Sequence, residues 1–567
     1  MDLLMKHIHM CRQTKHGETQ ITLDEDLNVP DIRPDVERII QSRGRIVIEH
    51  TRAETQKLYA DGFMEVDILY MDNTKERQLH RLNTKLPFDE AFSMDELEPG
   101  QEGIRLRHEI EDLSISLINS RKLAIRALVS LDASVDEIQD LSAAVQAPVS
   151  IHSDASESSA FDSSSHESSG SIPSLCEKTQ KLEFLQLEVR NKDILRLKED
   201  VQLPSNKPDI REILWEDVEL RGCRTHLADG KITVQGSLFL FVLYLADAES
   251  ESLQWLEQSI PVEGELACSG CTAELIPDIE VTLAESSITA KEDSDGEMRT
   301  FHLEGTLELT IRLYGTGQAE ILTDVYSPEK DLELVTSDET YETLIVRNES
   351  KCKAQGKLRI QSAKPRILQL MHSSGSVRID KTEIVPDGIK IQGALPVSIL
   401  YISPDDTQPI AVLEGSIPFS HVAEAQGITG STSDDAENPD VSALEQTNTP
   451  CRYSLTTSLD QLSATMSDSE EIEVRASIGL NLFAVRTEKQ RCIHEIHESD
   501  YAPERLEAVP GITGYIVQKG DTLWDIAKEY FSTPAQIMEM NGLTSDQIKK
   551  GDCLILMKNV RLLKNAV

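Results

Sequence analysis

The sequence predicts mainly β repeats, folded as antiparallel sandwich-like domains, followed by a small βααβ domain at the carboxyl end. Three observations support this multidomain fold. Four landmark residues recur three times with unchanged spacing, and apolar residues alternate between them. Residues 513–557 break this pattern, because two helix-capping motifs lie there between short apolar strands.

The landmarks start at Pro34, Pro208 and Pro365. A glycine follows each proline after 28 residues, a tyrosine eight residues further on, and a second proline 17 residues after that. The periods of 174 and then 157 residues are too long for solenoid repeats of ~20–50 residues, so each copy is domain-sized. We expect β-rich repeats at residues 20–145, 185–335 and 350–502. The other landmarks are Gly62, Tyr70 and Pro87; Gly236, Tyr244 and Pro261; and Gly393, Tyr401 and Pro418.

The central segment of each repeat reads as a strand with one apolar face. Apolar side chains occupy every second position from Ile389 to Tyr401, and the same holds from Ile232 to Tyr244. A glycine on that face predicts a bulge or the close packing of another element. Pro396 cannot donate a ladder hydrogen bond, which predicts an edge or a bulge at that point.

Two polar stretches separate or interrupt the repeats. Residues 146–180 are predicted to form a linker, because 12 of the 25 residues from 150 to 174 are serine. Residues 424–449 are predicted to be a polar loop inserted into the third repeat.

The charge and composition exclude several classes of function. The 98 acidic and 56 basic residues give a net charge of −42, which disfavours nucleic acid and anionic membranes as partners. The most apolar run, residues 236–246, is shorter than the ~20 residues of a transmembrane helix, and the amino terminus lacks a secretory h-region. Nine scattered cysteines suit a reducing compartment, so we expect a cytosolic start.

The predicted carboxy-terminal domain covers residues 513–558. Thr522 is predicted to cap a first helix together with Asp525, and Thr533 a second helix with Pro534 at its first position. Asn541-Gly542 is predicted to end that helix, before a last strand.

This segment resembles a LysM domain, through Gly520, Asp521, Thr522, Leu523, Trp524 and Asn541 among others. The resemblance implies a shallow groove for glycans that contain N-acetylglucosamine, between the loop after the first strand and the loop after the second helix. A structural role in the fold is the alternative for Leu523, Ile526 and Asn541. The implied groove residues are Gly520, Asp521, Thr522, Leu523, Asn541, Gly542, Leu543, Thr544 and Ile548.

The combination of three such repeats with one terminal LysM resembles the SipL-type spore coat assembly proteins. That resemblance implies a protein of the mother-cell cytoplasm at the forespore surface, and later of the spore coat. The partners implied are the coat-basement ATPase and other spore coat proteins.

Two groups of side chains could carry metal or redox chemistry. Cys268 and Cys271 form a single CxxC, whereas a structural zinc site needs four ligands; two ordinary thiols, or a crosslink in a mature coat, are the alternatives. Cys492, His494 and His497 lie on a predicted strand that would point His497 away from the other two.

We therefore predict a non-enzymatic scaffold with no catalytic residue, no metal and no cofactor. The alternative function is a cell-wall protein that binds peptidoglycan or another N-acetylglucosamine glycan. Export would favour this alternative, whereas a cytosolic LysM domain needs a protein partner or a wall that is exposed later.

Overall fold

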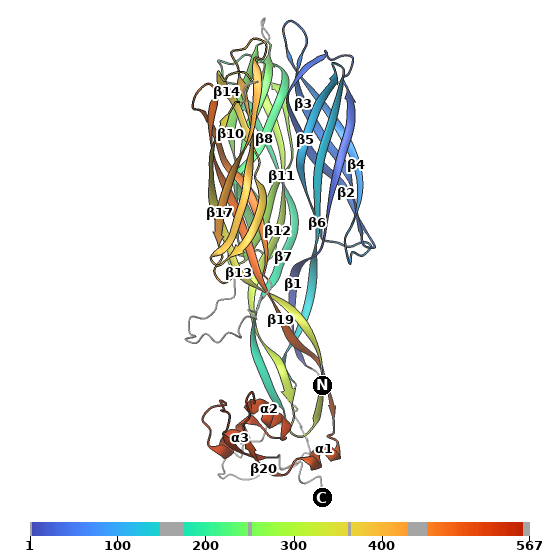
Figure 1. The fold of residues 1–567 in the computed structure, drawn as a ribbon, viewed down its shortest axis with the longest axis vertical. Coiled ribbons are helices and arrows are strands. Elements are labelled where there is room, and N and C mark those ends of the chain that lie inside the picture. Colours follow the sequence, from blue (N-terminus) through green and yellow to red (C-terminus); the bar gives the residue numbers. More distant parts are fainter. Residues whose placement is uncertain (1–2, 148–174, 248–251, 361–363, 429–450, 559–567) are drawn as a thin grey trace.

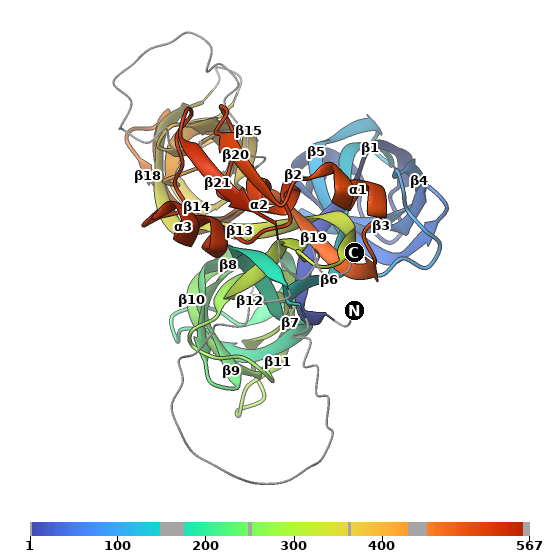
Figure 2. The same ribbon diagram turned by 90° about the horizontal axis from the view of Figure 1, so that it is seen from below.

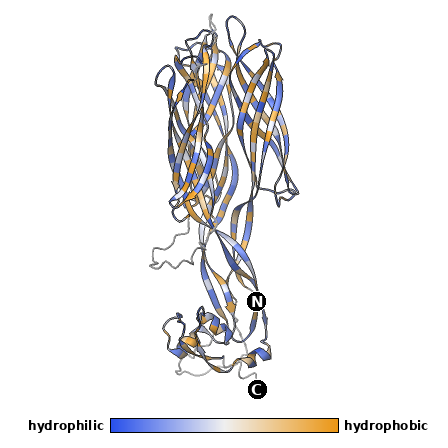
Figure 3. Ribbon diagram, viewed as in Figure 1, coloured by the Kyte–Doolittle hydropathy of each residue, from blue (hydrophilic) through white to orange (hydrophobic). Residues whose placement is uncertain are grey.

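The computed structural model describes residues 3–147, 175–247, 252–360, 364–428 and 451–558. Three β repeats lie side by side at one end of an elongated molecule, their outer strands continue together as a narrow stalk, and a small α/β domain lies at the other end (Figure 1). Bands of polar and apolar residues alternate along the strands (Figure 3). The predicted fold class is confirmed.

Every repeat consists of two antiparallel sheets. Their strand orders are β1-β6-β5 and β2-β3-β4, then β11-β12-β7 and β10-β9-β8, then β13-β19-β18 and a sheet in which β16 pairs with β14, β15 and β17. The first repeat comprises β1 (Leu4–Asn28), β2 (Val36–Glu54), β3 (Lys57–Asp72), β4 (Leu79–Ser93), β5 (Ile104–Asn119) and β6 (Lys122–Gln146). The second comprises β7 (Cys176–Gln202), β8 (Ile210–Ala228), β9 (Lys231–Ala246), β10 (Leu253–Ala267), β11 (Ile276–Glu292) and β12 (Met298–Tyr326). The third comprises β13 (Asp331–Arg359), β14 (Gln369–Gly375), β15 (Arg378–Val385), β16 (Gly388–Ile402), β17 (Ile410–Glu424), β18 (Cys451–Met466) and β19 (Glu471–Ser499).

The landmark tyrosine and the first landmark proline of each repeat contact each other. The hydroxyl of Tyr70 donates to the carbonyl oxygen of Pro34 at 3.2 Å. Tyr244 and Tyr401 make the same bond, at 3.2 and 2.9 Å, to the prolines that precede them by 36 residues. All three tyrosines are fully buried, so this bond satisfies a hydroxyl that water cannot reach.

The landmark glycines lie opposite bulges, as predicted. A Cβ on Gly62 would collide with the carbonyl oxygen of Val47, and one on Gly393 with that of Arg378. The strand register shifts next to both positions, between Ile48 and His50 and between Ile379 and Lys381. Glycine therefore lets the bulged neighbour come close to the central strand.

Pro396 lies in the central strand β16 and not in an edge strand, but its missing N–H falls at a break in the neighbouring strand. β14 ends at Gly375 and β15 begins at Arg378, and the amide of Ser376 donates to the carbonyl oxygen of Pro396 at 3.2 Å. The corresponding strands β2 and β8 of the other repeats are continuous. The proline thus coincides with an interrupted partner, which fits the loss of a ladder donor.

The central strands bury both of their faces at one end. Tyr70 of β3 faces the core of its own repeat, whereas Leu69 and Met71 face the other two repeats. We call the resulting inter-repeat cluster the hub. Its buried members are Leu69, Met71, Leu79, Leu214, Trp215, Phe241, Leu243, Leu245, Met371, Leu400, Ile410 and Val412.

The stalk is built from the first and last strands of each repeat. β1 pairs with β6, β7 with β12 and β13 with β19, and the pairs extend beyond the sandwiches (Figure 1). Apolar side chains from all three pairs meet inside the stalk, for example Ile8, Phe184 and Cys492. These strands begin before the expected repeat starts at residues 20, 185 and 350.

Residues 150–174 of the expected linker and most of the expected insertion at 424–449 lie outside the described residues. Within the part that the structure describes, no helix combines the length and the apolar composition of a membrane span.

Candidate functional site

The terminal domain has the predicted strand–helix–helix–strand order. It comprises β20 (Ile512–Ile516), α2 (Leu523–Glu529), α3 (Pro534–Asn541) and β21 (Cys553–Met557), and a short α1 (Pro503–Ala508) precedes it. The hydroxyl oxygens of Thr522 and Thr533 accept from the amides of Asp525 and Gln536, at 3.2 and 3.1 Å. Gly542 ends α3 with a φ of 64°, a left-handed conformation that favours glycine. The predicted caps are therefore confirmed.

The implied groove residues divide into core and surface. Leu523 is only 2% exposed and belongs to the domain core, against which Leu543 and Ile548 pack half-buried. The structure thus brings these three side chains together. A charged residue in place of Leu523 would disturb folding rather than report on binding. The remaining surface positions Gly520, Thr522, Gly542 and Thr544 are exposed.

Asp521 and Asn541 are committed to hydrogen bonds within the domain. Asp521 accepts from the hydroxyl of Tyr515 at 2.7 Å and from the amide of Gln518 at 2.8 Å. These two bonds lower the pKa of Asp521, and the same contact raises the pKa of Tyr515 to about 12. Asn541 donates to the carbonyl oxygens of Ile537 and Ile555, at 2.8 and 2.9 Å. Both side chains therefore stabilise the two loops.

The outer side of α2 docks on the end of the stalk. The indole Nε1 of Trp524 donates to Asp324 at 2.8 Å, and Lys528 pairs with the same carboxylate at 2.7 Å. The Trp524 ring also meets Tyr326 edge-to-face, with centroids 4.9 Å apart. The hydroxyl of Tyr326 donates to the carbonyl oxygen of Ser532 at 3.0 Å, and burial strongly raises its pKa. Trp524 and Lys528, one helical turn apart, thus both bind Asp324 near the end of β12.

A second set of contacts completes this LysM–stalk junction. Tyr501 meets the ring of Phe531 edge-to-face at 4.7 Å and donates to the carbonyl oxygen of Ser327 at 2.8 Å. Arg505 of α1 pairs with Asp331 at 3.2 Å. In the described part of the chain, the exposed groove residues make no hydrogen bond or ion pair with the stalk. The junction therefore leaves the surface of the groove loops open.

The sequence did not reveal the stalk side of this junction. Asp324 and Tyr326 lie about 200 residues before their partners, and their own string shows nothing beyond strand alternation. In the sequence, Trp524 stands out only through the resemblance to LysM domains. Burial of a Tyr and a Trp against each other is a tertiary contact with no local sequence signal.

A second polar site lies among the three repeats. His372, whose side chain is 1% exposed, bonds to Asp217 at 3.1 Å and Glu257 at 3.0 Å, and its ring stacks on Phe241 at 4.0 Å. Asp217 also pairs with Arg43 at 3.3 Å. Burial lowers the pKa of His372, but the bonds to the two carboxylates outweigh it, so the pKa lies above the ordinary histidine value. The three repeats are thus joined by a buried ionic network.

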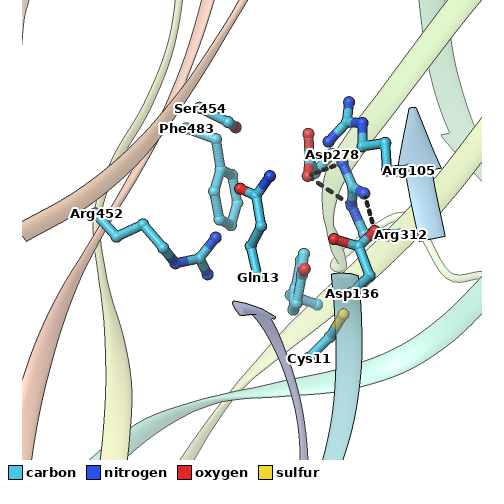
Figure 4. Close-up of a pocket in the computed structure, with 10 residues that line it drawn as sticks. Cys11, Gln13, Arg105, Asp136, Asp278, Arg312, Arg452, Ser454 and Phe483 are labelled. Carbon is cyan, nitrogen blue, oxygen red and sulfur yellow. Dashed lines mark hydrogen bonds and ion pairs between the residues drawn. The ribbon is translucent and has the colours of Figure 1, made fainter. Parts of the chain in front are cut away.

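A small cavity lies further along the same inter-repeat contact. Arg312 bonds there to Asp136 at 2.7 Å and to Asp278 at 2.8 Å. Arg452 lies across the cavity from these groups, and Cys11 lies beside Asp136 (Figure 4). The cavity volume is about 10 Å³, room for about one water molecule. Its paired charges therefore hold the repeats together and leave no room for an organic substrate.

The cysteines and histidines that the sequence grouped have different surroundings in the structure. Cys268 and Cys271 are buried in the core of the second repeat, and burial raises the pKa of both thiols. Cys492 bonds to Tyr341 at 3.1 Å inside the stalk, whereas His494 contacts Ser337 and His497 is exposed. For Cys268 and Cys271, this burial fits the alternative of two ordinary thiols.

Two protein-family models match parts of this chain. A model described as the SPOCS domain of SipL matches residues 35–118, 209–291 and 366–447, and a LysM model matches residues 515–556. The chain contains three SipL SPOCS domains and one LysM domain. No curated protein and no solved structure matches the chain.

The SPOCS matches cover only part of each folded repeat. They begin at β2, β8 and β14, after the first strand of each repeat, and the first two matches end before β6 and β12. The strands that build the stalk therefore lie largely outside the matched segments. The domain set relates this chain to sporulation, and both kinds of domain are binding modules rather than catalytic ones.

Proposed function

We propose that the chain is a non-enzymatic scaffold for spore coat assembly. It acts in the mother-cell cytoplasm at the forespore surface and afterwards in the coat. Its LysM domain binds the coat-basement ATPase and other coat proteins, and the SPOCS repeats hold that domain in place and link it to the coat layers.

The observation that carries this proposal is the place of the LysM domain. It lies at the end of the stalk, away from the sandwiches (Figure 1), and is held by the outer side of α2. The exposed Gly520, Thr522, Gly542 and Thr544 stay accessible to an extended peptide or loop. Such a bipolar shape suits a linker between two layers.

The charge distribution supports a protein partner at this end. Residues 513–567 contain seven basic and six acidic side chains, a net charge of +1 in a chain of −42. An acidic partner would be repelled by the repeats but not by the LysM domain.

A pull-down from sporulating cells tests the proposal. The full chain and a chain that ends after Pro510 would be used as baits, and the bound proteins identified. We expect the full chain to capture a coat ATPase and coat proteins, and the shortened chain to lose them while its far-ultraviolet circular dichroism stays that of a β protein. Equal capture by both would move the partner site to the repeats.

Glycan binding is the second candidate function, because the LysM match itself favours it. Co-sedimentation with insoluble peptidoglycan separates the two. Sedimentation of the wild-type chain that Thr544→Glu abolishes would support the glycan, whereas capture of coat proteins with no sedimentation would support the scaffold.

A further inference from the structure

The two-stranded LysM sheet turns an apolar face away from its helices. Leu554 and Leu556 of β21 point into the domain core and are almost fully buried. Ile512 and Ile516 of β20 and Ile555 of β21 point the other way and are 67%, 57% and 51% exposed. Single exposed isoleucines are ordinary, but three on one small face form a patch.

The two edges of this sheet differ. On the β21 side, the amide group of Asn541 bonds to both the N–H and the carbonyl oxygen of Ile555, at 2.7 and 2.9 Å, and so closes that edge. On the other side, no strand among the described residues pairs with β20. The sheet therefore has one closed and one open edge.

The open edge presents a definite set of backbone groups. Gly511 and Val517 bond to the β21 side, through Lys558 and Asp552. Because backbone groups alternate along a strand, those of Ile512, Gly514 and Ile516 point to the open edge. Among the described residues, the one hydrogen bond that these groups make at this edge is from the side chain of Gln518 to the Ile516 carbonyl oxygen, at 2.8 Å.

The strand is self-complementary about Gly514. It reads Ile-Thr-Gly-Tyr-Ile from residue 512 to 516. If two copies pair antiparallel with Gly514 opposite Gly514, Ile512 of each copy lies across from Ile516 of the other copy. Gly514 has open space where a Cβ would be, so nothing blocks that approach. Up to roughly six backbone hydrogen bonds would form.

Charge and position favour a second copy at this end. Two chains of −42 repel each other, but least at their LysM ends, where the local net charge is +1. β20 lies at the lower end of the molecule in Figure 1, away from the sandwiches, and in the view from below in Figure 2 β20 and β21 lie in front of the repeats. A tip-to-tip contact would therefore keep the acidic repeats of the two copies far apart.

We propose that the chain dimerises through β20, which pairs antiparallel with β20 of a second copy to form a four-stranded sheet across two LysM domains. The shared surface is small, so the dissociation constant falls in the micromolar range. This contact goes beyond the scaffold function and involves other residues than the groove loops, so each can fail without the other.

Sedimentation equilibrium of the full chain over a range of concentrations tests the register. Ile512→Lys combined with Ile516→Lys places like charges opposite each other, and we expect the dissociation constant to rise at least ~10-fold. Ile512→Lys combined with Ile516→Glu places opposite charges across the same two pairs and should restore the dimer. Ile138→Lys, at a position of the first repeat that is also about half exposed, is the control and should leave the dissociation constant unchanged.

Four results would overturn the proposal, three of them from the experiment above. These three are a wild-type chain that stays monomeric, a dimer that the Lys/Lys variant leaves intact, and a Lys/Glu variant as monomeric as the Lys/Lys one. A chain that dimerises only after removal of residues 559–567 would also overturn it, because the edge would then be occupied by that segment.

Discussion

The hub and the LysM–stalk junction join parts of the same chain in different ways. The hub packs twelve buried apolar side chains from three repeats and adds the buried His372 network. The junction depends on two edge-to-face aromatic contacts and on charged groups such as Lys528 that remain partly exposed. The three repeats are therefore joined by a shared core, whereas the LysM domain is held by a smaller contact that can be altered separately.

A cavity in the hub should give the largest effect. Leu243→Ala removes a fully buried side chain of this cluster, to which all three repeats contribute, and we expect the free energy of unfolding to fall by about 2–5 kcal/mol. Urea denaturation measures it. Ile194→Ala, at an exposed position of β7, is the control and should stay within about 0.5 kcal/mol of wild type. Equal effects would show that the hub is not a core.

Loss of Trp524 should free the LysM domain and spare the repeats. Trp524→Ala removes the contact with Tyr326 and the bond to Asp324, and we expect about 2 kcal/mol less docking energy because the indole is only partly buried. Proteolysis between β19 and β20 should become at least ~10-fold faster. Trp524→Phe keeps an aromatic ring and should fall between the two. An unchanged rate for Trp524→Ala would remove the junction from this account.

The stability that the His372 network gives to the hub should also depend on pH. The pKa of His372 is raised in the folded chain, so its contribution to stability is complete below the ordinary histidine pKa and is lost as the pH rises through the folded value. The free energy of unfolding of wild type should therefore exceed that of His372→Gln most at low pH, and the difference should shrink as the pH rises. His497→Gln alters an exposed ring and is the control. A difference that grows with pH would contradict the assignment.

The landmark hydroxyl should give the smallest effect. Tyr401→Phe removes only the bond to the carbonyl oxygen of Pro365, and we expect a loss of about 1 kcal/mol. Tyr401→Ala also empties a fully buried site and should cost about 3–5 kcal/mol. Equal losses in the two variants would mean that the hydroxyl, and not the packing, explains the repeated tyrosine.

Local features could be predicted from the sequence, and distant contacts could not. The caps at Thr522 and Thr533 and the glycine at each bulge follow from residues a few positions apart. The stalk strands have an ordinary alternating pattern. The pattern does not show that Ile8 and Phe184 are covered by other repeats, because those repeats are distant in the sequence. Of the groove residues, Leu523 fitted both a binding and a core role in the sequence, and only its burial separates the two.

The central claim is that the LysM groove, and not the repeats, recruits the chain to the forespore. The most direct measurement is the location of fluorescently tagged full-length chains in sporulating cells. Thr544→Glu places a charge on an exposed groove loop, and Ala535→Glu places the same charge on an exposed position of α3 outside these loops. We predict that Thr544→Glu spreads through the mother cell while Ala535→Glu surrounds the forespore like wild type. A Thr544→Glu chain that still surrounds the forespore would contradict the claim.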